Sequence, residues 1–196
     1  MNPTPPSAVV IGASVGAVQA LSIILPRLPE NYPLPVFVAV HVPPDKRSAL
    51  ADLFASRCAV TVKEAEDKEP VCPGTVYFAP ADYHLLVEED FTLSLSSDEP
   101  VLYSRPAIDV LFESAADAYG DSLTGIILTG ASADGARGLQ AVHAAGGFTM
   151  VQAPDTAEGS AMPLAALAAC PEARAFTLEE ISLVLLSTSQ PVTSTP

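Results

Sequence analysis

The feature that most constrains the fold of this chain is a repeated pairing of a short apolar run with a segment of helical spacing. The runs at 8–12, 36–40, 123–128 and 148–152 are dominated by Val, Ile, Leu and Phe. Short runs of this kind are typical of parallel strands that are covered on both faces. Because helical patterns separate them, we predict an α/β fold with a doubly wound, mostly parallel sheet in a Rossmann-like three-layer arrangement.

Prolines mark the ends of several expected helices. The first helix follows the strand at 8–12 and stops at Pro26, and Pro106 introduces another that covers 107–119. Further helices are expected near residues 50–54, 136–145, 164–169 and 178–186.

Residues 60–96 change character. Short runs at 60–62, 76–78, 85–87 and 91–95 are separated by Pro, Gly and acidic turns. This pattern predicts short antiparallel strands, as a meander or hairpin added to the parallel sheet.

The length of 196 residues is sufficient for one domain with a substantial core. We expect a flexible leader at 1–7, a single folded domain at 8–188 and a flexible polar tail at 189–196. No internal repeat, coiled coil or long linker divides the chain.

Composition excludes several classes of protein. The net charge is −14 with only nine Lys and Arg residues, which argues against nucleic-acid binding. The three cysteines, Cys58, Cys72 and Cys170, are odd in number and scattered, so they fit neither a disulfide framework nor a zinc site. We expect no metal and no cofactor.

The first 26 residues carry no charged side chain. They lack the positive start of a signal peptide, and Gly12, Ser14, Gly16 and Gln19 interrupt their apolar character. A spanning helix needs roughly 20 apolar residues, so we read this stretch as a strand, a turn and a helix. We expect no membrane insertion and a cytoplasmic protein.

Ser14 is the first candidate catalytic residue. It is the centre of a G-x-S-x-G pattern that begins at Gly12 and lies between the first strand and the first helix. In such a turn, small neighbours let the hydroxyl project above the sheet near the positive end of the helix. An ordinary glycine turn is an equal alternative from this motif alone. A dinucleotide-binding turn is not, because Ser14 and Ala17 replace two of its glycines.

His41 closes the next apolar strand. A lone histidine there is more often a structural residue than a catalyst. However, ligand crevices in doubly wound sheets lie at the carboxyl ends of the strands, where Ser14 is also expected. An adjacent imidazole is the usual means of activating a serine, so we predict that the two act together.

Asp134 lies in the glycine-rich loop that follows the strand at 123–128. Taken alone it is best explained as a helix N-cap or as part of a phosphate-binding loop. With Ser14 and His41 already assigned to this rim, it is the best candidate to orient the imidazole.

Other titratable residues fit less well. Asp82, Asp109 and Asp155 have hairpin, helix and late-loop contexts, and His84 and His143 have no comparable serine partner. No His or carboxylate pair has the spacing of metal ligands.

Several separate blocks, in order, resemble the catalytic domain of the CheB-type protein-glutamate methylesterases over almost the whole chain. The blocks are IGASVGAVQAL, VAVHVPP, VKEAED, PGTVYFAPADYHLLV, SRPAIDVLFESAA, LTGASADGARGL and GSAMP. The family triad order of Ser, His and Asp carries over onto Ser14, His41 and Asp134.

This resemblance implies hydrolysis of γ-glutamyl methyl esters on chemoreceptor helices with release of methanol, and in some members deamidation of receptor glutamines. Ser14 would be the nucleophile and His41 the general base, with Asp134 holding the imidazole tautomer. Backbone amides near His41 and Ala131 would stabilise the oxyanion. The partner would be the methylated cytoplasmic helices of a chemoreceptor.

The chain departs from the family pattern at three places near the site. Val15, Ala17 and Ala131 stand where the family usually has Thr, Gly and Met. Val15 removes a hydroxyl that could bond within the site, whereas Ala131 retains its backbone amide.

Typical members also carry an N-terminal receiver domain. Here the motif begins at Gly12, which leaves no room for one, so we expect either a stand-alone enzyme or a fragment of a longer chain. Because receptor helices are acidic, we predict a locally positive docking face around Lys46, Arg47, Arg105 and Arg137.

Two other functions remain open from the sequence. One is a catalytically impaired relative that binds receptors or signalling proteins, and the other is an esterase with different substrates, since one scaffold supports many functions.

Overall fold

The structure is a computed structural model that describes residues 8–41 and 49–188. The predicted leader at 1–7 and tail at 189–196 lie outside the described residues.

A seven-stranded sheet forms the centre of the molecule, and every neighbouring pair of its strands is parallel. The spatial order is β3-β4-β2-β1-β7-β8-β9. The early strands β2, β4 and β3 lie on one side of β1, and the later strands β7, β8 and β9 lie on the other, so the strand order switches sides at β1, as in doubly wound folds. The strands are β1 (Ala8–Ala13), β2 (Val36–Val40), β3 (Thr61–Glu64), β4 (Thr75–Phe78), β7 (Leu123–Ile127), β8 (Phe148–Gln152) and β9 (Arg174–Phe176).

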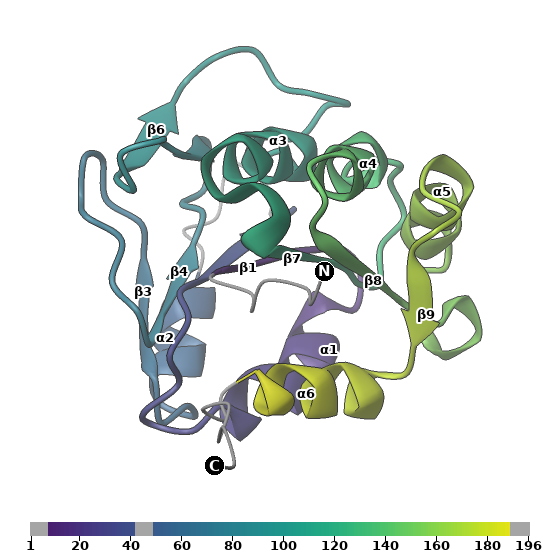
Figure 1. The fold of residues 1–196 in the computed structure, drawn as a ribbon, viewed down its shortest axis with the longest axis horizontal. Coiled ribbons are helices and arrows are strands. Elements are labelled where there is room, and N and C mark those ends of the chain that lie inside the picture. Colours follow the sequence, from purple (N-terminus) through teal and green to yellow (C-terminus); the bar gives the residue numbers. More distant parts are fainter. Residues whose placement is uncertain (1–7, 42–48, 189–196) are drawn as a thin grey trace, which may run out of the picture.

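Helices cover both faces of the sheet, as Figure 1 shows. One layer consists of α3 (Ile108–Tyr119), α4 (Ala136–Ala144) and α5 (Ala161–Ala169). The opposite layer consists of α1 (Ala17–Ile24), α2 (Leu50–Ala55) and α6 (Leu178–Ser187). The predicted three-layer α/β architecture is therefore confirmed.

Each face of the sheet has its own hydrophobic core. In β1, Val10 packs into the core under α3 and α4, whereas Val9 and Ile11 pack into the core under α1 and α6. All three are fully buried, which explains why this strand is apolar throughout and does not alternate with polar residues. Burial of one such side chain stabilises the fold by about 1.5–3 kcal/mol.

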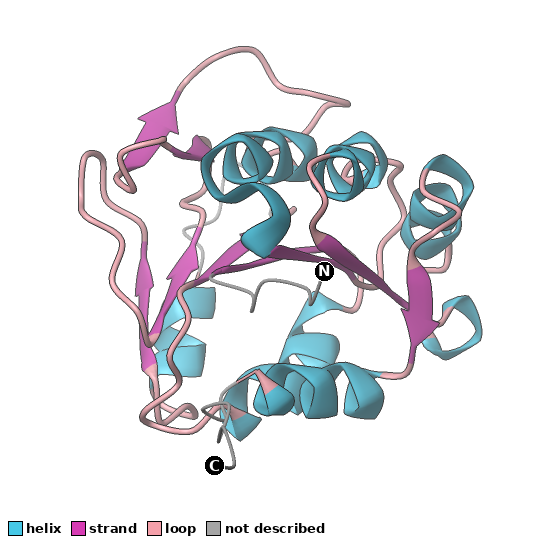
Figure 2. Ribbon diagram, in the orientation of Figure 1, coloured by secondary structure: helices cyan, strands magenta, loops and turns pink. Residues whose placement is uncertain are grey.

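A separate two-stranded antiparallel hairpin lies beside α3. It consists of β5 (His84–Val87) and β6 (Leu93–Ser96), seen at the upper left of Figure 2. The predicted antiparallel insert is confirmed for these two strands.

The prediction was wrong for β3 and β4, which join the parallel sheet. All four residues of β4 are buried because β2 and β3 flank it and helices cover it, so it is an inner strand. The segment between β3 and β4 instead contacts the hairpin, where Lys68 and Val71 donate backbone hydrogen bonds to Leu93 and Phe91.

The sequence reading also missed β9. This strand has three residues, lies at the edge of the sheet and is mostly exposed, so it carries no apolar run. Within residues 8–41 and 49–188, no helix has the length and apolar character needed to span a membrane.

Gly12 provides a test of how tightly β1 and α3 approach each other. A Cβ atom at Gly12 would overlap Ile108 Cγ2 and lie 3.1 Å from Ile127 Cδ1. We expect Gly12→Ala to lower the free energy of unfolding by about 1–3 kcal/mol, because overpacked cores have to shift backbone or rotamers. Denaturant unfolding measures this difference.

Gly125→Ala in β7 is the matched control. Its added Cβ would meet only side-chain ends, at 3.2–3.3 Å. A Gly12→Ala variant that is no less stable than Gly125→Ala would contradict the close packing described for Ile108.

Candidate active site

Ser14 lies in the turn between β1 and α1. Its backbone N–H donates to the Thr129 carbonyl at 2.9 Å, and its own carbonyl accepts from the Ala17 N–H at 3.0 Å. Gly16 has a φ of +81° and begins α1 as its N-cap. A Cβ there would lie 2.9 Å from Glu158 Cβ and 3.0 Å from Thr129 Cγ2, so both backbone and packing require glycine.

His41 follows β2 at the neighbouring strand end. In the β1–β2 register Ala13 lies opposite Val40, and the His41 N–H donates to the Ala13 carbonyl at 3.1 Å. Ser14 and His41 therefore follow two paired strand ends at the same level. The His41 N–H itself belongs to the sheet, and the amides that follow it lie outside the described residues, so the predicted oxyanion role of amides near His41 remains a prediction.

Asp134 is fully buried and accepts three hydrogen bonds. Its Oδ2 accepts from His41 Nε2 and from the Ile108 N–H, both at 2.7 Å, and its Oδ1 accepts from the Asp109 N–H at 2.9 Å. Because an ionised carboxylate can only accept, we assign the His41 ring proton to Nε2 from this hydrogen-bond arrangement. The imidazole Nδ1 is then the proton acceptor of the ring, and the His41 side chain is 13% exposed.

The position of Asp134 explains why helix capping and catalysis could not be separated by sequence. Asp134 does not cap its own helix, since α4 begins after Gly135 with no side-chain cap. It accepts instead from the first two N–H groups of α3, at Ile108 and Asp109. Asp134 therefore does act as a helix cap, but for α3, and the same carboxylate joins α3 to His41.

Asp109, which from the sequence is only a weak candidate to orient the imidazole, caps the start of α4 in the same way that Asp134 caps α3. Its Oδ1 accepts from the Gly135 N–H at 2.9 Å and the Gly138 N–H at 2.7 Å, at the start of α4. Burial raises the pKa of Asp109, and the negative charge of Asp134 adds to that rise, while the backbone donors oppose it. Helical spacing alone could not reveal that the first turns of α3 and α4 face each other.

Thr129 fixes the turn that carries Ser14. Its hydroxyl donates to the Val15 carbonyl and accepts from the Gly159 N–H, both at 2.8 Å. Its backbone N–H donates to Gln152 Oε1 at 2.9 Å. The ends of β1, β7 and β8 are thereby joined around the serine turn.

The remaining sequence candidates lie elsewhere or have structural roles. His84 is buried, where Nδ1 accepts from the Ala107 N–H and Nε2 donates to the Glu99 carbonyl. His143 lies 3.8 Å from Glu172 on the surface, and Asp155 is exposed. In the described part of the chain, no group of three or more His, Cys, Asp or Glu could hold a metal ion.

The two described arginines of the predicted positive docking face are already paired. Arg105 binds Asp82 with its Nη2 at 2.6 Å, and Arg137 binds Glu113 with its Nε at 2.7 Å. Lys46 and Arg47 lie outside the described residues. The positive face is therefore unsupported at these two arginines, whose charges are largely neutralised.

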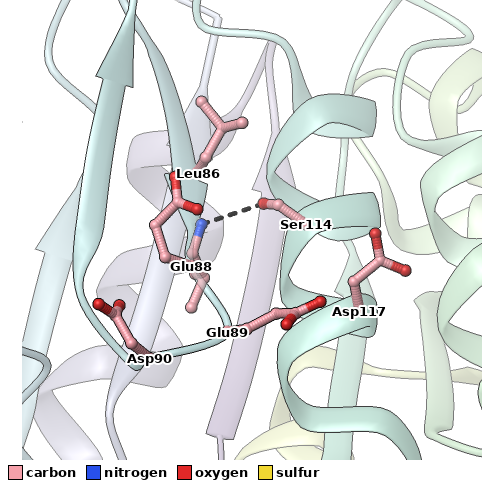
Figure 3. A pocket seen from close by; sticks show the side chains of 7 residues that line it. Leu86, Glu88, Glu89, Asp90, Ser114 and Asp117 are labelled. Atoms are coloured by element: carbon pink, nitrogen blue, oxygen red, sulfur yellow. Dashed lines mark hydrogen bonds between the residues drawn. The ribbon is translucent and has the colours of Figure 1, made fainter.

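A pocket of about 520 Å³ lies between the turn that joins β5 to β6 and the later part of α3 (Figure 3). Ser114 holds its wall by accepting the Val87 N–H at 3.1 Å. The wall is acidic, with Glu88, Glu89, Asp90 and Asp117. It contains none of the three predicted catalytic residues.

The fold and the His41–Asp134 pair define a class of protein: a doubly wound α/β domain with a histidine–carboxylate pair at the ends of its parallel strands. Comparison with known families makes the assignment specific, since the CheB methylesterase family model matches residues 9–185. The chain belongs to the CheB methylesterase family.

Individual relatives agree with this assignment. A Leptospira interrogans protein, provisionally named protein-glutamate methylesterase/protein-glutamine glutaminase, is 42% identical over 93% of this chain and 95% of its own length. The Archaeoglobus fulgidus protein-glutamate methylesterase/protein-glutamine glutaminase is 41% identical over 81% of this chain, which spans 46% of that protein. The crystal structure of the Thermotoga maritima CheB methylesterase catalytic domain matches with a TM-score of 0.88 and 34% identity, covering 94% of this chain and 99% of that one.

Substitutions of Asp109 test the reciprocal caps. Asp109→Ala removes the acceptor for two N–H groups at the start of α4, so we expect a loss of about 1–3 kcal/mol in the free energy of unfolding. Asp109→Asn retains an amide oxygen as acceptor and should lose much less. Chemical denaturation at neutral pH measures both.

The pH dependence of Asp109→Asn separates charge from capping. Because the pKa of Asp109 is raised in the folded state, its ionisation destabilises the fold as pH rises through that folded pKa. The stability of Asp109→Asn relative to wild type should therefore increase from acidic to neutral pH. A difference that is constant with pH, or that decreases, would contradict a buried, charge-sensitive Asp109.

Proposed function

We propose that this chain is a serine hydrolase that removes the methyl group from glutamate γ-methyl esters on chemoreceptor helices and releases methanol. The observation that carries the proposal is the 2.7 Å hydrogen bond from His41 Nε2 to the buried Asp134, at the strand end next to Ser14. Membership of the CheB methylesterase family and the names of the relatives support the same activity.

In the proposed first step, Ser14 Oγ attacks the ester carbonyl carbon while His41 Nδ1 accepts the hydroxyl proton. The imidazolium that forms is stabilised by Asp134, which already receives the Nε2–H. His41 then gives the proton to the departing methoxide, so methanol leaves and an acyl-serine remains. Water attacks this intermediate with His41 again acting as base, which yields the free γ-carboxylate and restores the serine.

Two groups are suited to the negative charge that develops on the carbonyl oxygen. One is the Ala131 backbone amide, in the exposed loop between β7 and Asp134. The other is the first turn of α1, apart from the Ala17 N–H, which already donates to the Ser14 carbonyl. No cofactor takes part in these steps. The carboxamide of a receptor glutamine could react in the same way with ammonia as the leaving group, consistent with the double name of the relatives.

Methanol release from a methylated chemoreceptor tests the activity and its nucleophile together. We expect release by the wild-type protein and none above background from Ser14→Ala. Ser187→Ala, on α6, is the control and should retain wild-type rates.

Failure of the wild type to release methanol from several receptors would contradict the proposed function. Hydrolysis of p-nitrophenyl acetate without receptor turnover would then indicate an esterase of different specificity. Loss of both activities with retained receptor binding would indicate a binding module.

Asp134→Asn tests the role of the buried carboxylate. The amide group would present a donor to His41 or Ile108, so the imidazole would lose the tautomer that accepts a proton from Ser14. We expect kcat to fall by roughly 10³–10⁴, as in other triads. Asp155→Asn is the exposed control, and a fall of less than tenfold in Asp134→Asn would contradict this role.

A further inference from the structure

The connection between β6 and α3 carries a small hairpin whose turn residues are unusual. Val101 and Ser104 exchange both backbone hydrogen bonds, with N–H to carbonyl distances of 3.1 and 2.9 Å. Leu102 and Tyr103 are the two residues between them, with φ values of +47° and +65°. A two-residue turn with positive φ at both positions favours Asn-Gly or Gly-Gly, since other side chains are strained there.

Nothing within the described chain explains why large apolar residues occupy this turn. Leu102 is 52% exposed, and Tyr103 is 102% exposed, so the Tyr103 side chain is not covered by any of residues 8–41 and 49–188. Figure 2 shows the whole connection as a long loop that projects beyond the helices at the top of the molecule. Strained and exposed bulky residues are typical of contact sites for another molecule.

The base of the small Val101–Ser104 hairpin is held in place by several hydrogen bonds. Arg105 donates to Asp82 with Nε and Nη2, and its Nη1 donates to the carbonyls of Ser97 and Asp98 at 2.9 and 3.0 Å. His84 ties down both ends of the connection by bonding the Glu99 carbonyl and the Ala107 N–H. The tip is therefore presented on a fixed base.

The same segment leads directly into the candidate active site. Only three residues separate Ser104 from Ile108, whose N–H donates to Asp134 at 2.7 Å. A molecule bound at the tip would therefore contact the same segment whose Ile108 N–H supports the histidine–carboxylate pair.

Electrostatics favour an apolar contact over a charged one. The chain carries a net charge of −14, and Arg105 and Arg137 are both paired with carboxylates. An acidic receptor would gain little from those arginines. Leucine and tyrosine offer apolar area that does not depend on charge, and tyrosine loses little conformational freedom when it binds.

We propose that Leu102 and Tyr103 form a docking contact for the protein substrate, packing against an apolar stripe of the receptor helix that carries the modified glutamate. This inference rests on the proposed methylesterase function. It assigns substrate affinity to the hairpin tip and leaves the chemical step to the strand ends.

The double substitution Leu102→Asn with Tyr103→Gly tests the contact without endangering the turn. Asn-Gly is the preferred pair for positive φ at both positions, so the melting temperature should stay the same or rise. Turnover of p-nitrophenyl acetate should be unchanged. For methanol release from a methylated receptor cytoplasmic fragment, we expect kcat/KM to fall at least about tenfold, mainly through KM.

Leu183→Gln is the matched control, because Leu183 is also a large exposed apolar residue but lies on α6, on the opposite face of the sheet. It should leave receptor kcat/KM within twofold of wild type. Tyr103→Phe keeps the aromatic surface and should retain most of the receptor activity.

Three outcomes would overturn the docking role. The first is a folded double variant whose receptor kcat/KM stays within twofold of wild type. The second is a double variant that loses as much kcat/KM toward p-nitrophenyl acetate as toward the receptor. The third is a wild-type protein that is a dimer and that the double substitution converts to a monomer. The proposed methylesterase function has a separate test. If the wild type hydrolyses p-nitrophenyl acetate but releases no methanol from receptors, that function is wrong, and the docking role, which rests on it, is wrong as well.

Discussion

The buried carboxylate of Asp134 is the interaction on which the arrangement of this site depends. It receives the His41 ring N–H and two backbone N–H groups from the start of α3, so one side chain joins three separate segments. Removal of any donor would leave part of a buried charge unsatisfied, which is costly in a dry interior. The orientation of the imidazole is thereby tied to the packing of a helix against the sheet.

The packing around Asp134 explains the small residues of these loops. Gly12 lets Ile108 approach β1, and Gly135 has a φ of +96° where a Cβ would lie 2.7 Å from Ile108 Cγ2. Asp109 completes the arrangement by capping α4 while Asp134 caps α3. Site geometry and fold stability therefore share the same residues, and substitutions here should change both.

Much of this could be predicted from sequence because strand ends in a parallel sheet meet at one rim. That rule brought together Ser14, His41 and Asp134 as candidates, and in the structure His41 and Asp134 are joined by a 2.7 Å hydrogen bond. The role of Asp109 could not be predicted, because it depends on the approach of two helices. The parallel pairing of β3 with β4 was missed because short alternating runs do not reveal which partners will cover them.

Covalent labelling with a fluorophosphonate tests the central claim most directly, namely that Ser14 is a nucleophile activated by the His41–Asp134 pair. The account predicts a single labelled peptide carrying Ser14 in the wild type, much slower labelling in Asp134→Asn, and none in Ser14→Ala. Labelling at another residue, or labelling of Asp134→Asn at the wild-type rate, would contradict it.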